Sequence, residues 1–128
     1  MTESLTRTNA ATKPSHRIKV IIADDHPIVR SGIKAELDAA LEVEVVGEAA
    51  NGDQALKQVA ALGPDVLILD VNMPGTKALT VLHDLRALNS PPKVFVLTVE
   101  EDVECVVAML KAGATGYLVK DEHPRTIV

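Results

Sequence analysis

The sequence predicts an α/β fold in which an open parallel sheet is covered by helices on both faces. Short runs rich in Val, Ile and Leu alternate along the chain with segments of helical periodicity. Apolar residues make up 47% of the chain but aromatic residues only 2%, which is typical of a buried parallel sheet filled by aliphatic side chains. The length of 128 residues suits one domain with a single core. Strands separated by single helices favour parallel pairing with right-handed crossovers.

Five segments have the composition expected of strands, because β-branched residues recur in short runs. They are IKVIIAD (18–24), VEVVGEA (43–49), DVLILD (65–70), KVFVLT (93–98) and GYLVK (116–120). Residues 1–16 are rich in Thr, Ser, Asn and Ala without periodicity, which predicts a disordered leader. The folded domain is therefore expected to occupy residues 17–128.

The segments between the strands have helical spacing. Their apolar positions are, in chain order, Ile33, Leu37 and Leu41; Leu56 and Val59; Leu79, Leu82, Leu85 and Leu88; and Val103, Val106, Val107 and Leu110. Pro27 suits the first turn of the first helix, and Asn51 can cap the second. Gly113 is expected to end the fourth.

Polar residues stand where the predicted strands end. Asp24 and Asp25 follow the first strand, Asp70 ends the third, Thr98 ends the fourth and Lys120 ends the fifth. In open parallel sheets, ligands bind beyond the carboxyl ends of the strands. Three carboxylates, a hydroxyl and an amine are therefore expected to meet at one rim, where the function should be sought.

Three carboxylates held close together repel one another, so a cation or protons must compensate them. All-oxygen ligands suit Mg²⁺, which commonly binds one or two carboxylates together with phosphate oxygens. One carboxylate could then attack phosphorus while the ion and a lysine neutralise the transferred group. Each residue also has a simpler explanation: an Asp can be a helix cap, a Thr a strand former and a Lys a solvated charge. Their combination favours a site.

Four other residues are expected to have structural roles. His26 precedes a proline and is expected to be a loop residue or to lie before a helix cap rather than to bind the metal ion. An imidazole among oxygen ligands would favour a softer ion than Mg²⁺. Cys105 is expected to lie off the apolar stripe of its helix and to be inert. Met73 and Met109 are expected to pack in the interior.

Five motifs, in this order, carry a resemblance to a known family: DDHPIVRSGI, VGEAANGDQAL, PDVLILDVNMPG, LTVEED and KAGATGYLVKD. From about Ile18 to Thr126 the chain resembles the receiver domain of bacterial two-component response regulators. The similarity is to the class with a LuxR or NarL type (FixJ) DNA-binding domain. The resemblance implies a flavodoxin-like fold with strand order 2-1-3-4-5.

The same resemblance implies roles for the acidic residues. Asp70 would accept a phosphoryl group from a sensor histidine kinase. Asp25 and Asp70 would ligate Mg²⁺ directly, Asp24 would help through water, and Asn72 would contribute its backbone carbonyl. The protein would then be a signalling receiver that promotes only its own phosphorylation and dephosphorylation, rather than an enzyme acting on other substrates.

The resemblance also implies a switch. Thr98 and Lys120 would contact the phosphoryl group, and the rotamer of Tyr117 would follow Thr98 on activation. The surface formed by the helix at 101–112 and the last strand would then change its partners and control a transcription-regulating output domain. A homodimer is among the partners that such a surface allows.

The chain departs from the family pattern in two places. Thr76, Lys77 and Ala78 follow NMPG where the family usually continues to a glycine, which predicts a differently shaped loop beside Asp70. Pro124 suits the first turn of a fifth helix, but the sequence given ends at Val128, so this helix is expected to be truncated and the DNA-binding domain absent. Sheet surface left bare in this way would favour dimerisation or marginal stability.

Charge and composition exclude several classes of function. The net charge is −5, with 18 acidic and 13 basic residues, so this chain by itself is not expected to bind nucleic acid. The single cysteine, Cys105, forms no internal disulfide, and the first residues lack a secretory signal. No apolar run approaches the length of a membrane span, so a cytoplasmic location away from the membrane is expected.

Three other functions agree with the predicted fold. A phosphohydrolase of the haloacid dehalogenase type needs a second aspartate as general acid, where this chain has Asn72. A nucleotide-binding protein needs a glycine- or hydroxyl-rich loop after the first strand, where Asp24 and Asp25 would repel phosphate. An unphosphorylated adaptor would use the fold only as a docking surface, and the complete set of Asp, Thr and Lys argues against it.

Overall fold

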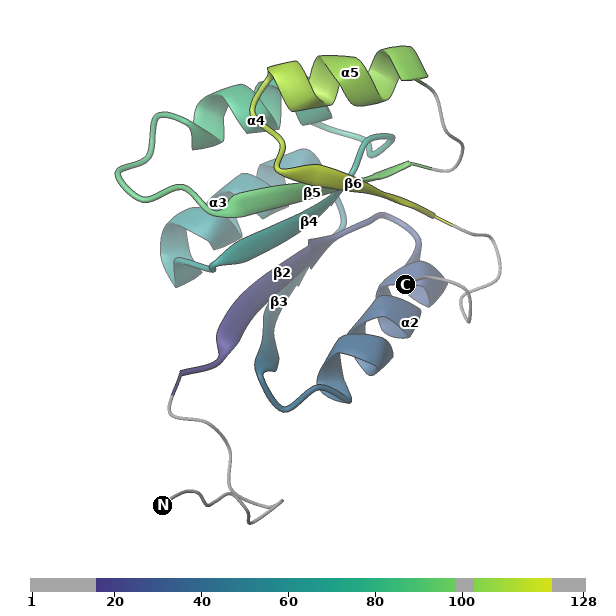
Figure 1. Cartoon of the computed structure of the whole chain (residues 1–128), viewed down its shortest axis with the longest axis vertical. Coiled ribbons are helices and arrows are strands. Elements are labelled where there is room, and N and C mark those ends of the chain that lie inside the picture. Colours follow the sequence, from purple (N-terminus) through teal and green to yellow (C-terminus); the bar gives the residue numbers. More distant parts are fainter. Residues whose placement is uncertain (1–15, 99–102, 121–128) are drawn as a thin grey trace.

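The computed structural model describes residues 16–98 and 103–120. Strands and helices alternate along the described chain (Figure 1). Their bounds are β2 Ile18–Ala23, α2 Pro27–Asp38, β3 Val43–Ala49, α3 Gly52–Leu62, β4 Val66–Asp70, α4 Ala78–Leu85, β5 Lys93–Thr98, α5 Val103–Lys111 and β6 Gly116–Val119. The predicted strands agree with these bounds to within one residue.

The strands form one parallel sheet in the order β3-β2-β4-β5-β6. Counted along the chain, this is the predicted order 2-1-3-4-5, which is therefore confirmed. The chain runs from β2 to the edge strand β3 and then crosses back over β2 to β4. This reversal makes the carboxyl ends of β2 and β4 the point of the sheet where a ligand site is expected.

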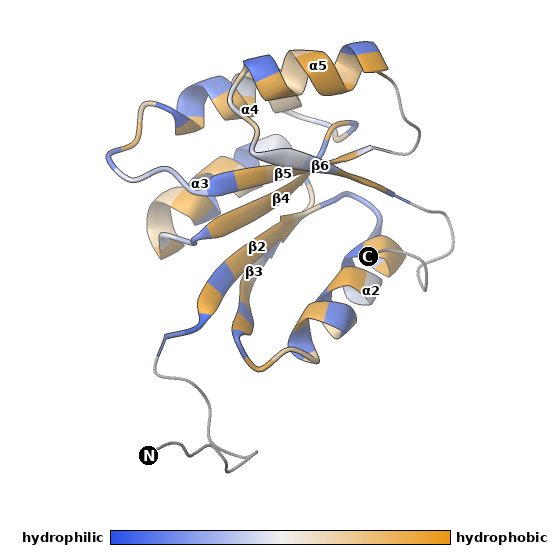
Figure 2. Cartoon of the chain, in the orientation of Figure 1, coloured by the Kyte–Doolittle hydropathy of each residue, from blue (hydrophilic) through white to orange (hydrophobic). Residues whose placement is uncertain are grey.

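Helices cover both faces of the sheet, with α2 on one face and α3, α4 and α5 on the other (Figure 1). Successive strand residues point to opposite faces. Ile21 and Leu69 therefore pack in the core beneath α3, α4 and α5, whereas Ile22 and Ile68 pack beneath α2. Figure 2 shows the resulting near-continuous apolar character of the central strands. A strand buried on both faces holds the residue at its carboxyl end in a fixed position.

The predicted starts of α2 and α3 agree with the local geometry, and α3 also has a glycine at its end that was not predicted. The Asn51 side chain accepts a hydrogen bond from the backbone N–H of Gln54 at 2.8 Å, which caps α3. Gly63 ends this helix with a φ of 58°, a left-handed conformation that glycine adopts without strain. Pro27 begins α2, and His26 is the residue before it, but the His26 side chain makes no capping hydrogen bond.

Of the four apolar positions predicted for α5, only Val106 lies in the core. Val103, Val107 and Leu110 are 70%, 41% and 41% exposed, whereas Val106 and Met109 lie in the core. Cys105, expected off the apolar stripe, is partly buried and packs against this core. The segment VECVVAMLK is apolar on most of its circumference, so its periodicity cannot decide which side faces the sheet.

Two other helices are shorter than their apolar patterns suggested. α2 ends at Asp38, so Leu41 lies beyond it and is exposed, and α4 ends at Leu85, before the exposed Leu88. Within the described residues, no helix is long and apolar enough to cross a bilayer. Residues 1–15 of the predicted leader, and the predicted fifth helix at Pro124, lie outside the described residues.

Candidate functional site

Two aspartates stand at the carboxyl ends of neighbouring strands. Asp24 directly follows β2 and Asp70 ends β4, and these strands pair in register through Ala23 and Leu69. Asp24 and Asp70 are 0% and 1% exposed. Carboxylates at this depth are tolerated only where cations or hydrogen-bond donors compensate them. The pairing register of the two central strands therefore places two buried carboxylates side by side, and a positive charge is needed nearby to compensate them.

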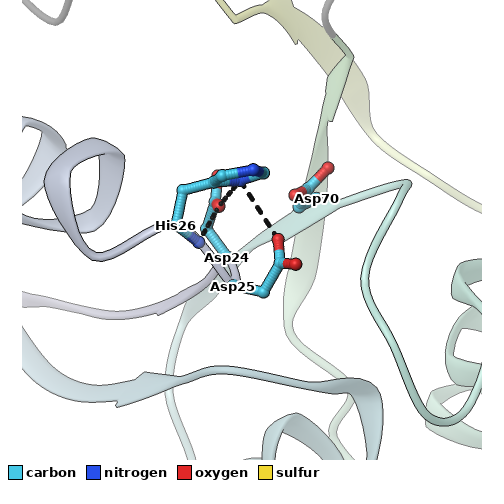
Figure 3. A group of neighbouring side chains, drawn as sticks. All are labelled: Asp24, Asp25, His26 and Asp70. Carbon is cyan, nitrogen blue, oxygen red and sulfur yellow. Dashed lines mark hydrogen bonds and ion pairs between the residues drawn. The ribbon is translucent and has the colours of Figure 1, made fainter.

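Asp25 and His26 complete a group of four side chains around this point (Figure 3). One potential ligand atom from each of Asp24, Asp25, His26 and Asp70 lies within 4.8 Å of the others. The side chains of Asp25 and His26 are 31% and 59% exposed. The group is thus buried on the side of Asp24 and Asp70 and open to solvent on the side of Asp25 and His26, as a ligand-binding site requires.

Lys120 brings a positive charge to the two buried carboxylates. It follows β6, and its Nζ lies 2.9 Å from Asp24 Oδ2 and 2.9 Å from Asp70 Oδ2. The residue is 6% exposed, so these ion pairs are shielded from water. The structure therefore brings together residues at the carboxyl ends of three different strands, as the sequence led us to expect.

Burial and ion pairing have opposite effects on the pKa values of Asp70 and Lys120. Burial raises the pKa of the Asp70 carboxyl above its usual value, against the lowering effects of the Asn72 backbone N–H and of Lys120. Burial lowers the pKa of the Lys120 ammonium, but hydrogen bonds to Asp24 and Asp70 outweigh it and the net shift is upward. Lys120 therefore stays charged, and the Asp70 carboxylate is more basic than an exposed one.

The remaining predicted residues lie around Asp70. The backbone N–H of Asn72 donates to Asp70 Oδ1 at 3.0 Å. Thr98 ends β5 beside Asp70 and is 4% exposed. Tyr117 pairs with Val96 in the β5–β6 register, so it lies on the same face of the sheet as Thr98, and it is 40% exposed.

Comparisons with known proteins agree with this geometry. A family model described as "Response regulator receiver domain" matches residues 20–128. The chain belongs to the response regulator receiver family. It is 40% identical over 109 residues to the nitrate/nitrite response regulator protein NarL of Escherichia coli K12, covering 85% of this chain and 50% of that protein. Its fold matches a NarL signal receiver domain from Mycobacterium tuberculosis with a TM-score of 0.80 and 34% identity, covering 86% and 89% of the two chains.

Another relative places the receiver domain in the same group. The chain is 38% identical over 112 residues to the oxygen regulatory protein NreC of Staphylococcus epidermidis, covering 87% of this chain and 51% of that protein. The receiver domain thus spans about half the length of these curated relatives. It has the flavodoxin-like receiver fold and resembles the receiver domains of NarL-type regulators, which makes it a signalling domain rather than a classical enzyme.

One residue that supports the receiver site, Arg30, could not be identified from the sequence. Arg30, in the first turns of α2, donates from Nη1 to the backbone oxygen of Asp24 at 2.7 Å and pairs through Nε with Glu48 of β3 at 3.1 Å. It fixes the backbone of Asp24 between a helix and the edge strand. The only signal in the sequence was a basic residue six positions after Asp24, and this spacing does not distinguish a residue that holds the Asp24 backbone from a surface charge.

The loop that follows Asp70 is fastened to the start of α3. The backbone N–H of Gly52 donates to Pro74 O at 3.4 Å, and the Thr76 hydroxyl donates to Asp53 Oδ1. Gly75 has a φ of 84°, which turns the chain toward these contacts. Ala78, the last of the three residues at which the chain departs from the family pattern, is 5% exposed and packs in the core. The unusual Thr76 therefore supplies an anchor for the loop that carries Asn72.

Gly52→Ala is expected to displace this loop, because a Cβ at Gly52 would lie 2.1 Å from the Thr76 backbone oxygen. Overpacking of this kind typically costs about 1–3 kcal/mol of unfolding free energy. We also expect Mg²⁺ affinity, measured by calorimetry, to fall about tenfold, as for other changes that misplace metal ligands. The control is Gly63→Asn, at a helix end with no atom within 4 Å of the added Cβ. Unchanged Mg²⁺ affinity in the Gly52 variant would show that the loop is not positioned by this contact.

Proposed function

We propose that residues 17–128 form a phosphoacceptor domain in which Asp70 accepts a phosphoryl group from a sensor histidine kinase. The main support is the buried Asp70 carboxylate, which lies 2.9 Å from the Lys120 ammonium and belongs to the acidic group with Asp24 and Asp25. The names of the relatives, which are nitrate, nitrite and oxygen regulators, support control of a transcription-regulating output domain. DNA would be contacted only through that output domain, and a homodimer is a further proposed partner.

In the proposed reaction, an Asp70 carboxylate oxygen forms a bond to phosphorus as the P–N bond of the kinase phosphohistidine breaks. The electron pair of that bond stays on the kinase imidazole, which then takes up a proton. The Asn72 N–H, 3.0 Å from Asp70 Oδ1, orients the carboxylate. Burial raises the pKa of Asp70, which makes its oxygens more basic and better nucleophiles.

Lys120 and Thr98 would stabilise the charge of the phosphoryl group. The Lys120 ammonium contacts Asp70 Oδ2 directly, so an oxygen attached to phosphorus at that position would lie beside a fixed positive charge. The Thr98 hydroxyl, at the end of the next strand, would donate to another phosphoryl oxygen. Both groups are held at the ends of packed strands, and their orientation therefore costs little when the reaction occurs.

The acidic group fits a magnesium ion. Carboxylate oxygens of Asp24, Asp25 and Asp70, with the Asn72 carbonyl, form the oxygen-only ligand set that Mg²⁺ prefers. Asp24 Oδ2 already pairs with the Lys120 ammonium at 2.9 Å, and Asp25 Oδ1 lies 3.1 Å from His26 Nδ1, so both oxygens face positively charged or polar nitrogen groups in the position where a cation would bind. When bound, Mg²⁺ supplies charge neutralisation and polarises a phosphoryl oxygen.

Phosphorylation by acetyl phosphate is expected to require Mg²⁺, because three carboxylates oppose an incoming anion until a cation neutralises them. Intact mass spectrometry would detect the addition of one phosphoryl group in the presence of Mg²⁺ and none in excess chelator. The control is a chelated sample to which excess Mg²⁺ is restored, which should recover the modification. Equal modification with and without chelator would contradict the proposed function.

The proposed switch couples Thr98 to Tyr117. A hydroxyl drawn toward a phosphoryl oxygen vacates space on the face of the sheet that the two residues share, and a ring can enter this space. Tyr117 is 40% exposed on β6, so its inward movement would change the surface that β6 and α5 present to partners.

Thr98→Ala is expected to leave phosphorylation measurable but to uncouple it from Tyr117. The chain has one tyrosine and no tryptophan, so intrinsic fluorescence reports on Tyr117 alone. Beryllofluoride with Mg²⁺ should change this fluorescence in the wild type and in Thr98→Ser, which keeps the hydroxyl, but not in Thr98→Ala. An unchanged response in Thr98→Ala would refute the coupling, as would undiminished phosphorylation-dependent association of that variant.

A further inference from the structure

The backbone of Asp24 is held on both sides by hydrogen bonds just beyond the end of β2. Its N–H donates to the backbone oxygen of Ala49 at 2.9 Å, and its carbonyl oxygen accepts a hydrogen bond from Arg30 Nη1 at 2.7 Å. The register between β2 and β4 ends with the pair of Ala23 and Leu69, one residue before Asp24. The Arg30 side chain therefore takes the place of a strand partner for the Asp24 carbonyl.

The direction of the Asp24 carboxylate depends on this backbone. Asp24 is fully buried, its Oδ2 lies 2.9 Å from Lys120 Nζ, and its Oδ1 accepts a hydrogen bond from the His26 backbone N–H at 2.8 Å. The aspartate side chain is short, so its oxygens follow any rotation of the main chain that carries them. A shift of the Asp24 peptide would therefore move both oxygens away from the positions that they hold in the acidic group.

Glu48 orients the Arg30 guanidinium. Arg30 Nε donates to Glu48 Oε1 at 3.1 Å, and the two side chains are only partly exposed. The planar guanidinium thus places one nitrogen on β3 and another on the Asp24 carbonyl, which its rigid fork of donors permits. Glu48 also compensates the charge of Arg30, which would otherwise repel a cation bound nearby. The Glu48 backbone oxygen in turn accepts a hydrogen bond from Gln58 Nε2 of α3 at 2.6 Å.

We propose that Arg30 is a positioning residue of the divalent cation site, and that it makes Mg²⁺ binding tighter by holding the Asp24 backbone. Arg30 acts through Asp24 and does not contact the ion. The inference rests on the proposed function, since it takes the acidic group to bind Mg²⁺. Groups that hold metal ligands in place typically contribute about 10–100-fold to metal affinity. Positioning and charge predict opposite results: loss of a nearby positive charge alone would strengthen Mg²⁺ binding, whereas loss of the hold on Asp24 would weaken it.

The test is calorimetric titration of the purified chain with Mg²⁺, for the wild type, Arg30→Met and Arg30→Lys. Methionine keeps much of the aliphatic stem but donates no hydrogen bond, so we expect the Mg²⁺ affinity of Arg30→Met to fall at least about tenfold. Lysine keeps the charge and can donate to the Asp24 carbonyl, although it lacks the fork that reaches two partners. Arg30→Lys should therefore bind Mg²⁺ more tightly than Arg30→Met.

The matched control is Lys34→Met, which removes a positive charge from the same helix. Lys34 pairs with Asp38 at 2.8 Å instead of with the Asp24 backbone, so this variant should bind Mg²⁺ at least as tightly as the wild type. Thermal melting without Mg²⁺ identifies a titration temperature at which every variant is folded. A change in Mg²⁺ affinity at that temperature then reports on the site rather than on unfolding.

Mg²⁺ binding by Arg30→Met that is as tight as in the wild type, or tighter, would overturn the proposal. Equal weakening in Lys34→Met would also overturn it, because any loss of charge from α2 would then have the same effect. Acetyl phosphate labelling of the wild type separates this failure from failure of the proposed function. If only the role of Arg30 is wrong, the wild type binds Mg²⁺ and is labelled. If the proposed function is wrong, the wild type shows neither Mg²⁺ binding nor labelling.

Discussion

Asp70→Asn is expected to abolish phosphoryl acceptance from acetyl phosphate and from a kinase. The substitution replaces the carboxylate with an amide of nearly the same shape, which is not a nucleophile toward phosphorus under these conditions. The amide oxygen can still accept the hydrogen bond from the Asn72 backbone, and removing a buried negative charge beside Asp24 relieves repulsion. The variant should therefore fold, and its loss of labelling would reflect chemistry.

The matched control is Asp65→Asn, because Asp65 directly precedes β4, at the opposite end of the strand from Asp70. Asp65 is exposed and accepts a hydrogen bond from the Lys19 backbone at 2.8 Å, so its substitution should leave labelling at the wild-type level. Intact mass gives the stoichiometry, and peptide mapping locates the modified residue. Labelling of Asp70→Asn at the wild-type rate would rule out Asp70 as the acceptor.

Lys120→Met is expected to have two effects, because one ammonium compensates two buried carboxylates. Removing one member of a buried ion pair typically costs about 3–5 kcal/mol of unfolding free energy. The rate of phosphorylation in Mg²⁺ should also fall about 10²–10³-fold, the usual effect of removing one preorganised charge-stabilising group. Added Mg²⁺ should restore much of the lost stability, since the ion takes over neutralisation of Asp24 and Asp70.

Thermal melting with and without Mg²⁺ measures the first effect, and mass-detected labelling rates measure the second. The control is Lys34→Met, which removes another lysine paired with an aspartate, Asp38, at 2.8 Å. That pair is largely exposed, and exposed pairs contribute about 0–1 kcal/mol, so the control should resemble the wild type. A Lys120→Met protein that melts like the Lys34 variant without Mg²⁺ would show that the buried carboxylates need no lysine.

The sequence predicted the fold and the approximate position of the site because both depend on local patterns. Apolar runs located the strands to within one residue, and alternation with helices required parallel pairing. Parallel strands bring their carboxyl ends to one edge, so Asp24, Asp70 and Lys120 could be placed together from topology alone.

The details that were missed depend on side-chain direction rather than on pattern. The inward turn of the His26 ring and the clamp from Arg30 to the Asp24 backbone involve rotamers that no spacing rule gives. The predicted apolar positions of α5 were right for Val106 and wrong for Val103, Val107 and Leu110, because apolar residues lie on most sides of this helix and only packing against the sheet decides which are buried. The anchor between Thr76 and Asp53 joins a loop residue to the first turn of α3, 23 positions away in sequence, and no regular repeat relates them.

The ion pair between Lys120 and Asp70 joins residues 50 positions apart in sequence, and the contact between Lys120 and His26 spans 94 positions. Contacts of such long sequence separation form late, because the intervening chain must be ordered first. On the ribosome, the growing chain would expose its aspartates well before it could supply the lysine. If Asp70 is the phosphoacceptor, as proposed, a nascent receiver would reach its full rate of phosphoryl acceptance only after its last strand had emerged and docked.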